Sequence, residues 1–426
     1  SFRYSPNGYL FESNKGQMLF SNNDGVMLAF LNTKVVQSFI ELINPTLSVQ
    51  SNEIKKLPFI PSIDFSKING VSTELIGLAK ADWDSFETSW DFKTFPILDL
   101  RSVSDKSPTD SVEESWNRWN ELTEQRISRM QELETENNRL FIDAYGLQDE
   151  LSPEVPLDQI TLARANKEKD TRRLLSYFIA CLMGRYSLDE PGLIYADAGN
   201  VGFDSSRYRT FRADDDGIVP VTDIEWFAQE AAHQFAKFMR TAWSDDRLAE
   251  NLRWVAAQLS PKAGEEPIET IRRYFSTSFF KDHMQTYKKR PIYWLFSSGK
   301  QKAFECLVYL HRYNESTLPR MRHEYVLPLM SKIGAQIETL AGHADEYGTR
   351  SGGLIDTSTS TSERNKLTRQ LETLKKKQTE LAQFDEKVRH YADMRVSLDL
   401  DDGVKVNYAK FGDLLAEVKT ITGTKD

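Results

Sequence analysis

The chain has 426 residues, a formal net charge of −9, 40% hydrophobic residues and 27% charged residues. This composition is typical of soluble proteins with a packed core, and it excludes fibrous, wholly disordered and membrane-embedded classes. The longest nearly apolar segment covers 174–184 and ends at Arg185, whereas a membrane-spanning helix needs about 20 such residues.

The first 60 residues are interpreted as the end of a mixed α/β domain. Residues 9–11 and 18–20 have the apolar and aromatic character of short strands. Apolar positions at helical spacing then predict one helix over 27–42, which Pro45 ends. The chain begins without Met and within a strand-like pattern, so we expect it to be the C-terminal piece of a longer protein.

The region 61–110 is predicted to hold a helix over 66–81 and then an acidic, aromatic connector. An α-rich domain follows over 111–315. Within it, apolar periodicity predicts helices over 112–143, 168–186, 222–241, 244–259 and 267–287. Two β-rich apolar runs, separated by residues 299–302, predict a β-hairpin over 291–313.

The last region, 316–426, is predicted to form a helical hairpin and one further helix over 404–419. The arms of the hairpin are expected at 316–347, with a kink at Pro328, and at 363–395. The linker 348–362 is rich in Gly, Ser and Thr and is predicted to be flexible.

The second arm carries a leucine heptad that two polar residues, Gln378 and Asp385, interrupt. This interruption favours packing within the chain over an intermolecular coiled coil. We therefore expect Leu371, Leu374 and Leu381 to be buried. The predicted fold class is mainly α with small β elements (α+β): a helical C-terminal region with a β-hairpin and a long helical hairpin.

Motifs of self-contained enzymes are missing from the sequence. It has no Gly-rich dinucleotide loop, and Gly299-Lys300 lacks the preceding Gly and the following Ser or Thr of a phosphate-binding loop. The six histidines form no HExxH pair, and the acidic segments 214–216 and 399–402 lack calcium-loop spacing. No catalytic residue and no metal site are predicted. The two cysteines, far apart in apolar segments, exclude a disulfide framework and predict a reducing, cytoplasmic setting.

Positive charge is concentrated in residues 281–322, which carry nine basic and three acidic side chains with interleaved aromatic residues. This pattern is typical of surfaces that contact a phosphate backbone. The alternative is that the aromatic residues form the core and the bases line a solvated rim. The candidate DNA-binding residues are Lys288, Lys289, Arg290, Lys300, Lys302 and Arg312, with Lys34, Lys55 and Lys56 as weaker candidates.

Four segments carry a resemblance to a known family: 136–162, 184–196, 281–314 and 398–418. They resemble the C-terminal half of the PglX-type adenine-specific DNA methyltransferases of BREX phage-defence systems. Residues 1–60 resemble the end of the target-recognition (DNA specificity) domain of that family.

The resemblance implies transfer of a methyl group from S-adenosylmethionine to adenine N6 in a specific double-stranded DNA site. It also implies other BREX defence proteins as partners. The family's catalytic Asn-Pro-Pro-aromatic motif is absent, because Thr46 follows Asn44-Pro45. Methyl transfer and cofactor binding are therefore expected to require an N-terminal catalytic domain outside this chain.

Three functional hypotheses follow. The first is a recognition part that positions duplex DNA for the catalytic domain. The second is a protein-interaction scaffold of the defence complex that does not contact DNA. The third, an independent enzyme, is opposed by the missing motifs. Under the first hypothesis, a phage protein that mimics DNA would bind the same basic surface.

Overall fold

The structure is a computed structural model that describes residues 2–5, 18–44, 51–61, 63–104, 107–349 and 361–423. The predicted strand at 9–11 and most of the predicted linker 348–362 lie outside these residues. The chain forms two compact units, Ser1–Ser89 with Asn117–Ala165 and Trp90–Trp116 with Asn166–Asp426. The helix Val112–Tyr145 contributes residues to both units, and the domain boundaries predicted at 60, 110 and 315 stay predictions.

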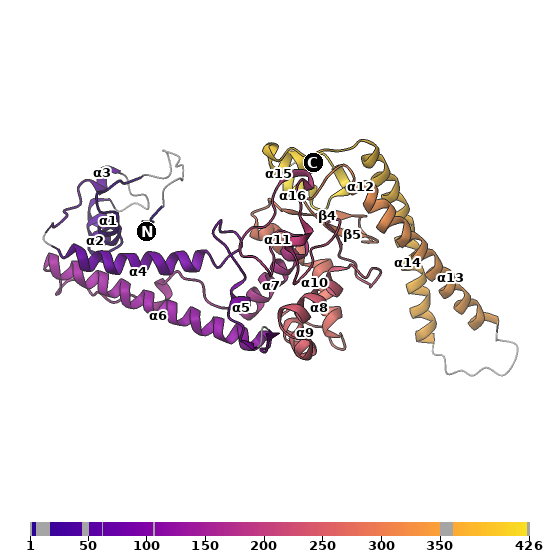
Figure 1. Cartoon of the computed structure of the whole chain (residues 1–426), viewed down its shortest axis with the longest axis horizontal. Coiled ribbons are helices and arrows are strands. Elements are labelled where there is room, and N and C mark those ends of the chain that lie inside the picture. Colours follow the sequence, from indigo (N-terminus) through magenta and orange to yellow (C-terminus); the bar gives the residue numbers. More distant parts are fainter. Residues whose placement is uncertain are drawn as a thin grey trace. The chain divides into compact units, whose positions relative to one another are not determined.

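Helices dominate both units (Figure 1). The first unit contains α1 (Asp24–Leu31), α2 (Lys34–Ile43), α3 (Ser51–Ile54), α4 (Phe65–Trp83) and most of α6 (Val112–Tyr145). The second unit contains α5 (Pro96–Asp99), α7 (Lys167–Leu182), α8 (Ala231–Ala242), α9 (Leu248–Ala257), α10 (Pro267–Thr277), α11 (Phe279–Thr286), α12 (Thr317–Arg320), α13 (Leu327–Thr349), α14 (Thr361–Asp393), α15 (Gly403–Ala409) and α16 (Val418–Thr422). Its strands are β1 (Val103–Ser104), β2 (Ser107–Pro108), β3 (Ile218–Pro220), β4 (Tyr293–Ser297) and β5 (Glu305–Tyr309). The predicted fold class is confirmed.

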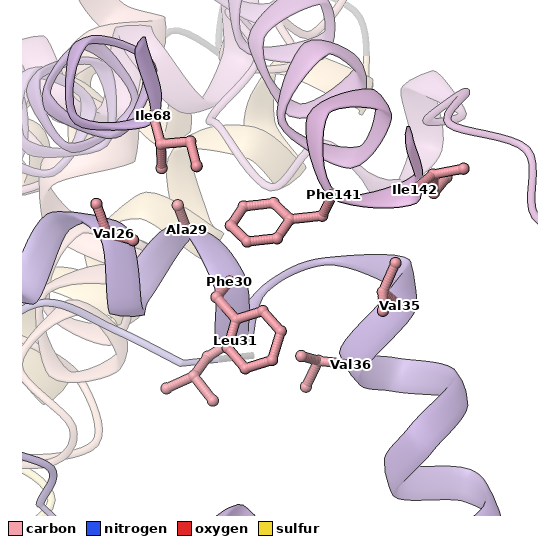
Figure 2. Packing of buried hydrophobic residues seen from close by; sticks show 9 residues of the cluster. All are labelled: Val26, Ala29, Phe30, Leu31, Val35, Val36, Ile68, Phe141 and Ile142. Atoms are coloured by element: carbon pink, nitrogen blue, oxygen red, sulfur yellow. The ribbon is translucent and has the colours of Figure 1, made fainter. Parts of the chain in front are cut away.

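The first unit is built on α4 and α6, which lie side by side (Figure 1). Arg129 on α6 pairs with Glu74 on α4 at 2.6 Å between Nε and Oε1. The small helices α1 and α2 pack on these two (Figure 2). The cluster that joins them consists of Val26, Ala29, Phe30, Leu31, Val35, Val36, Ile68, Phe141 and Ile142.

Two predictions for the N-terminal region are corrected. The single helix predicted over 27–42 is two helices, because Thr33 caps α2 with its hydroxyl oxygen, which accepts from Val36 N at 3.2 Å. A capping side chain of this kind satisfies a free backbone donor at the start of a helix, so a new helix begins after Thr33. The apolar spacing continues across this break, which is why the sequence pattern predicted one helix. Residues 18–20 are not in a strand.

Within the described residues, no single helix has both the length and the hydropathy of a membrane span. The bent pair α1 and α2, with 64° between its halves, reaches that length and hydropathy only when both helices are taken together.

The second unit contains the predicted hairpin, which is confirmed as β4 paired antiparallel with β5. The register pairs Tyr293 with Tyr309 and Ser297 with Glu305. A third strand that the sequence analysis did not predict, β3, pairs with the other edge of β5. Three residues next to an acidic loop are too few to show an alternating pattern, so this strand has no clear sequence signal.

Both faces of the hairpin are buried. Tyr293 packs on one face against His283 of α11, with 4.8 Å between ring centroids. Trp294 packs on the other face against Tyr408 of α15 and Phe411, at 5.2 and 5.7 Å. The aromatic residues of this segment are therefore core, as the alternative interpretation stated.

The helical tail departs from its prediction in two places. The predicted helix over 404–419 is broken into α15 and α16, because the chain between them runs along β4, where Ala416 N donates to Leu295 O at 2.8 Å. A π-helical stretch over Met321–Val326 directly precedes α13, near the kink predicted at Pro328. Proline has no backbone N–H and its ring crowds the carbonyl four residues earlier, and a wider turn relieves that clash.

The long hairpin of α13 and α14 is observed as predicted, with the two helices side by side (Figure 1). Leu374 and Leu381 are buried, whereas Leu371 is only half-buried. Asp385, which interrupts the heptad, is buried and accepts two hydrogen bonds from Arg322, at 2.7 and 3.0 Å. Of the two residues that interrupt the heptad, Asp385 therefore forms an ion pair within the chain, whereas Gln378 is exposed.

Replacing Leu374 by Ala is expected to lower the free energy of unfolding by about 2–5 kcal/mol, because a buried Leu leaves a cavity in the helix contact. Urea denaturation followed by circular dichroism measures this change. The matched control is Lys376→Ala on the exposed side of α14, which should change stability by less than about 0.5 kcal/mol. Equal curves for wild type and Leu374→Ala would contradict the packing.

Candidate nucleic-acid interface

Three consecutive candidate cations lie in the turn from α11 to β4, residues 287–290, which we call the basic turn. Lys289 N donates to Met284 O at 2.7 Å and Arg290 N donates to Tyr287 O at 2.9 Å, so the turn is held by its own backbone. Lys288 and Lys289 have φ values of 50° and 61°. This left-handed conformation is unfavourable for residues other than Gly, so each of the two lysines adds conformational free energy to the folded backbone.

The side chains of Lys288, Lys289 and Arg290 are exposed, and none has an ion pair with another described residue. Three like charges on consecutive residues repel one another, and no carboxylate of the described residues forms an ion pair that would offset this repulsion. The basic turn is therefore a compact positive surface that an anionic partner would stabilise.

The tip of the β-hairpin carries the next two candidates. Glu380 of α14 holds this tip by accepting from Ser298 Oγ, Gln301 N and Ala303 N, at 2.7, 2.6 and 3.2 Å. Lys300 is exposed there without an ion pair among the described residues.

Lys302 has partners within the chain. Its Nζ donates to Ser276 O at 2.7 Å and lies 3.1 Å from Glu305 Oε2. Burial raises the pKa of Glu305, and the charge of Lys302 partly offsets this rise. Lys302 therefore compensates a buried carboxyl, and of the two lysines at the tip only Lys300 is presented without such a partner.

Arg312 is not a surface residue, which corrects its assignment as a phosphate contact. It is 1% exposed. Its guanidinium donates to Asp214 O, Asp215 O and Asn200 Oδ1, at 2.6, 2.8 and 3.0 Å. A buried guanidinium needs such acceptors, and these use its donors on the chain itself. A phosphate of DNA cannot reach it.

The three N-terminal candidates lie in the first unit and differ from one another. Lys34 is half-buried, and its ammonium donates to the carbonyl of Glu154. Lys55 and Lys56 are exposed in the turn after α3. Lys34 therefore has a structural contact, and only Lys55 and Lys56 project into solvent.

The fold thus divides the basic residues of the segment 281–322 into those with partners inside the chain and those exposed without an ion pair among the described residues. Arg320 pairs with Glu324 at 3.3 Å and Arg322 with Asp385. The exposed bases without an ion pair among the described residues are Lys281, Lys288, Lys289, Arg290 and Lys300. The sequence pattern identified the basic segment but could not separate these residues from the internally bound ones.

Comparison with known protein families finds no matching family model. The chain is 41% identical to the adenine-specific methyltransferase BrxX of Escherichia coli O9:H4 (strain HS), over 99% of this chain and 36% of that protein. It is 37% identical to the adenine-specific methyltransferase PglX of Lacticaseibacillus casei (strain Zhang), over 100% of this chain and 34% of that protein. The chain therefore spans about a third of the length of these curated relatives. This similarity, which extends over the whole of this chain, confirms the predicted resemblance to adenine-specific methyltransferases.

Proposed function

We propose that the chain is the non-catalytic part of an adenine-specific DNA methyltransferase of a BREX defence system, and that it holds duplex DNA near the absent catalytic domain. The observation that carries this proposal is the similarity of the whole chain to two adenine-specific methyltransferases. The complete protein would use S-adenosylmethionine as methyl donor, bound by the domain outside this chain. Other BREX proteins are its proposed partners.

The proposed DNA contact within the second unit is the basic turn, with Lys300 at the hairpin tip. Exposure, the lack of ion pairs among the described residues and the left-handed backbone of Lys288 and Lys289 support this choice. Such contacts bind phosphates regardless of sequence, whereas reading a target site requires side chains that reach base edges. The basic turn therefore contributes affinity and orientation. Lys55 and Lys56 are the proposed contacts of the first unit.

A second candidate function is a protein-docking scaffold without a DNA contact. The observation in its favour is the exposure of large apolar side chains in the first unit, where Phe20 is 84% and Leu42 is 83% exposed. Exposed apolar residues are common at protein interfaces when they lie close together. Salt dependence separates the two functions, since a scaffold has no phosphate contacts to lose.

The isolated chain is expected to transfer no methyl group to DNA, because the family's catalytic motif is absent from its sequence. Incubation with duplex DNA and labelled S-adenosylmethionine measures this directly. Restored activity after addition of a catalytic domain would support the assignment. Site-specific label on adenine with the chain alone would refute it.

Reversing the charge of the basic turn with Lys288→Glu, Lys289→Glu and Arg290→Glu is expected to weaken binding to duplex DNA and to flatten the salt dependence. Each lost phosphate contact should lower the slope of log K against log salt concentration by about one unit, without a change in sequence preference. Fluorescence anisotropy over a salt series measures both quantities.

The matched control makes the same charge change elsewhere in the second unit. Lys366→Glu, Lys375→Glu and Lys376→Glu reverse three exposed lysines of α14. A general effect of net charge would weaken binding equally in both variants. Wild-type affinity and slope in the basic-turn variant would favour the solvated rim, and Lys55 and Lys56 would then be tested.

A further inference from the structure

Arg185 lies in the second unit immediately after α7, at the end of the longest apolar run of the chain. Gly184, with φ 80°, reverses the chain there, and Arg185 N donates to Ala180 O at 2.8 Å. The Arg185 side chain is half-buried. Its Nε is buried without a hydrogen bond, and no carboxylate of the described residues forms an ion pair with it.

Aromatic residues surround this guanidinium. Its Cζ lies 5.3 Å from the ring centroid of Tyr186 and 5.9 Å from that of Tyr287. These contacts stabilise a cation through the ring faces. A side-chain hydrogen bond also joins Arg185 to Tyr309, so Nε is the guanidinium donor that is buried without a partner. Tyr287 is also the first residue of the basic turn, so Arg185 lies beside that surface.

Two neutral histidines complete the surroundings. Burial, and next the charge of Arg185, lower the pKa of His283 to about 3 and that of His311 to about 4. His283 Nε2 accepts from Ile292 N and Tyr293 N, at 3.0 and 3.2 Å, so the proton is on Nδ1. This Nδ1 is buried and has no acceptor in the described residues.

The cluster therefore contains a cation, Arg185, that has no carboxylate partner among the described residues, and an N–H donor, His283 Nδ1, that has no acceptor among them. A half-buried charge without a counter-ion is costly, and so is a buried donor without an acceptor. An oxyanion removes both costs. Because guanidinium forms two parallel hydrogen bonds to phosphate oxygens, phosphate fits the cation in geometry as well as in charge. The three exposed cations next to Tyr287 would draw the same kind of ligand.

We propose that Arg185, with His283 and Tyr287 beside it, forms an anion site that accepts one phosphate group. Two sources share this chemistry: a phosphate of the DNA backbone and a free phosphate or nucleotide. Binding of a DNA phosphate at this site rests on the proposed function, whereas binding of a free phosphate or nucleotide does not depend on it. The site differs from the basic turn because its cation is half-buried and because it would hold its ligand by directed hydrogen bonds.

The first experiment tests the site without DNA. Inorganic phosphate and pyrophosphate are titrated into the wild-type chain at constant ionic strength with chloride as the reference salt, while ³¹P line width and melting temperature are followed. Saturable binding is expected, with at least tenfold weaker binding in Arg185→Gln. The control, Lys376→Gln, makes the same charge change on exposed α14 and should bind as wild type does. Because the wild-type titration stands by itself, the test does not depend on the folding of Arg185→Gln.

The second experiment identifies the source. The salt slope of duplex binding is compared for wild type, Arg185→Gln and the basic-turn charge reversal, after circular dichroism has verified that each is folded. A slope lower by about one unit in Arg185→Gln assigns the site to a DNA phosphate. Saturable phosphate binding with an unchanged slope assigns it to a free phosphate or nucleotide.

The absence of saturable phosphate binding together with an unchanged slope in Arg185→Gln overturns the inference. In that case Arg185 serves only to pack against its aromatic neighbours. If the basic-turn variant keeps the wild-type slope while phosphate still binds at Arg185, the DNA contact proposed above fails and the anion site remains. The two failures are therefore distinguishable.

Discussion

Replacing Arg312 by Met should lower the free energy of unfolding by about 3–5 kcal/mol. The side chain is buried and donates to three acceptors, two of which are carbonyls of the loop before β3. Met has a similar length but no donors, so these acceptors would remain buried without partners. Urea denaturation at neutral pH gives the change directly.

Two further variants separate this structural role from a contact with DNA. Arg312→Lys keeps the charge but cannot supply the guanidinium's spread of donors, so it should recover only part of the stability. Lys300→Met removes an exposed cation near the other end of the hairpin and should leave stability nearly unchanged. An Arg312→Met protein of wild-type stability that has lost a phosphate contact would show that Arg312 faces solvent.

Acidification below pH 6.5 should destabilise the chain through His283, by up to about 1.4 kcal/mol for each pH unit. Burial, and next the charge of Arg185, lower the pKa of this imidazole to about 3. The unfolded chain, with a His pKa of about 6.5, binds the proton that the folded chain rejects. The contribution of neutral His283 is therefore complete above pH 6.5 and is lost as the pH falls toward 3.

The comparison of wild type with His283→Gln isolates this contribution. Glutamine does not titrate, so the stability of the variant should fall less steeply between pH 6.5 and pH 4. Asp214 acts in the opposite direction, because burial and the adjacent Asp216 carboxyl raise its pKa and favour the protonated, folded form at low pH. Both proteins contain Asp214 and His311, so their contributions cancel in the difference. Parallel pH profiles would show that His283 is not held neutral.

The regular elements followed from the sequence because their signals are local. Apolar spacing located α4, α6, α7 and α14, since a helix buries one face at a fixed period whatever lies against it. The hairpin followed from two apolar runs around a Gly-containing turn, and its strands pair as expected. The resemblance to adenine-specific methyltransferases rested on long distinctive segments and was confirmed by the two relatives.

The roles of the charged residues were decided only by the tertiary structure. Arg312 and Lys288 look alike in the sequence, as bases flanking the same hairpin. The two backbone carbonyls that accept hydrogen bonds from the buried Arg312, those of Asp214 and Asp215, lie 98 and 97 residues away in the chain, and only folding brings them within reach. Arg185 gave only a weak signal, an arginine at the end of an apolar run. Burial of a charge depends on partners distant in sequence, whereas periodicity depends on neighbours, so the sequence by itself determined the helices and the hairpin, and the fold determined which cations remain exposed to a ligand.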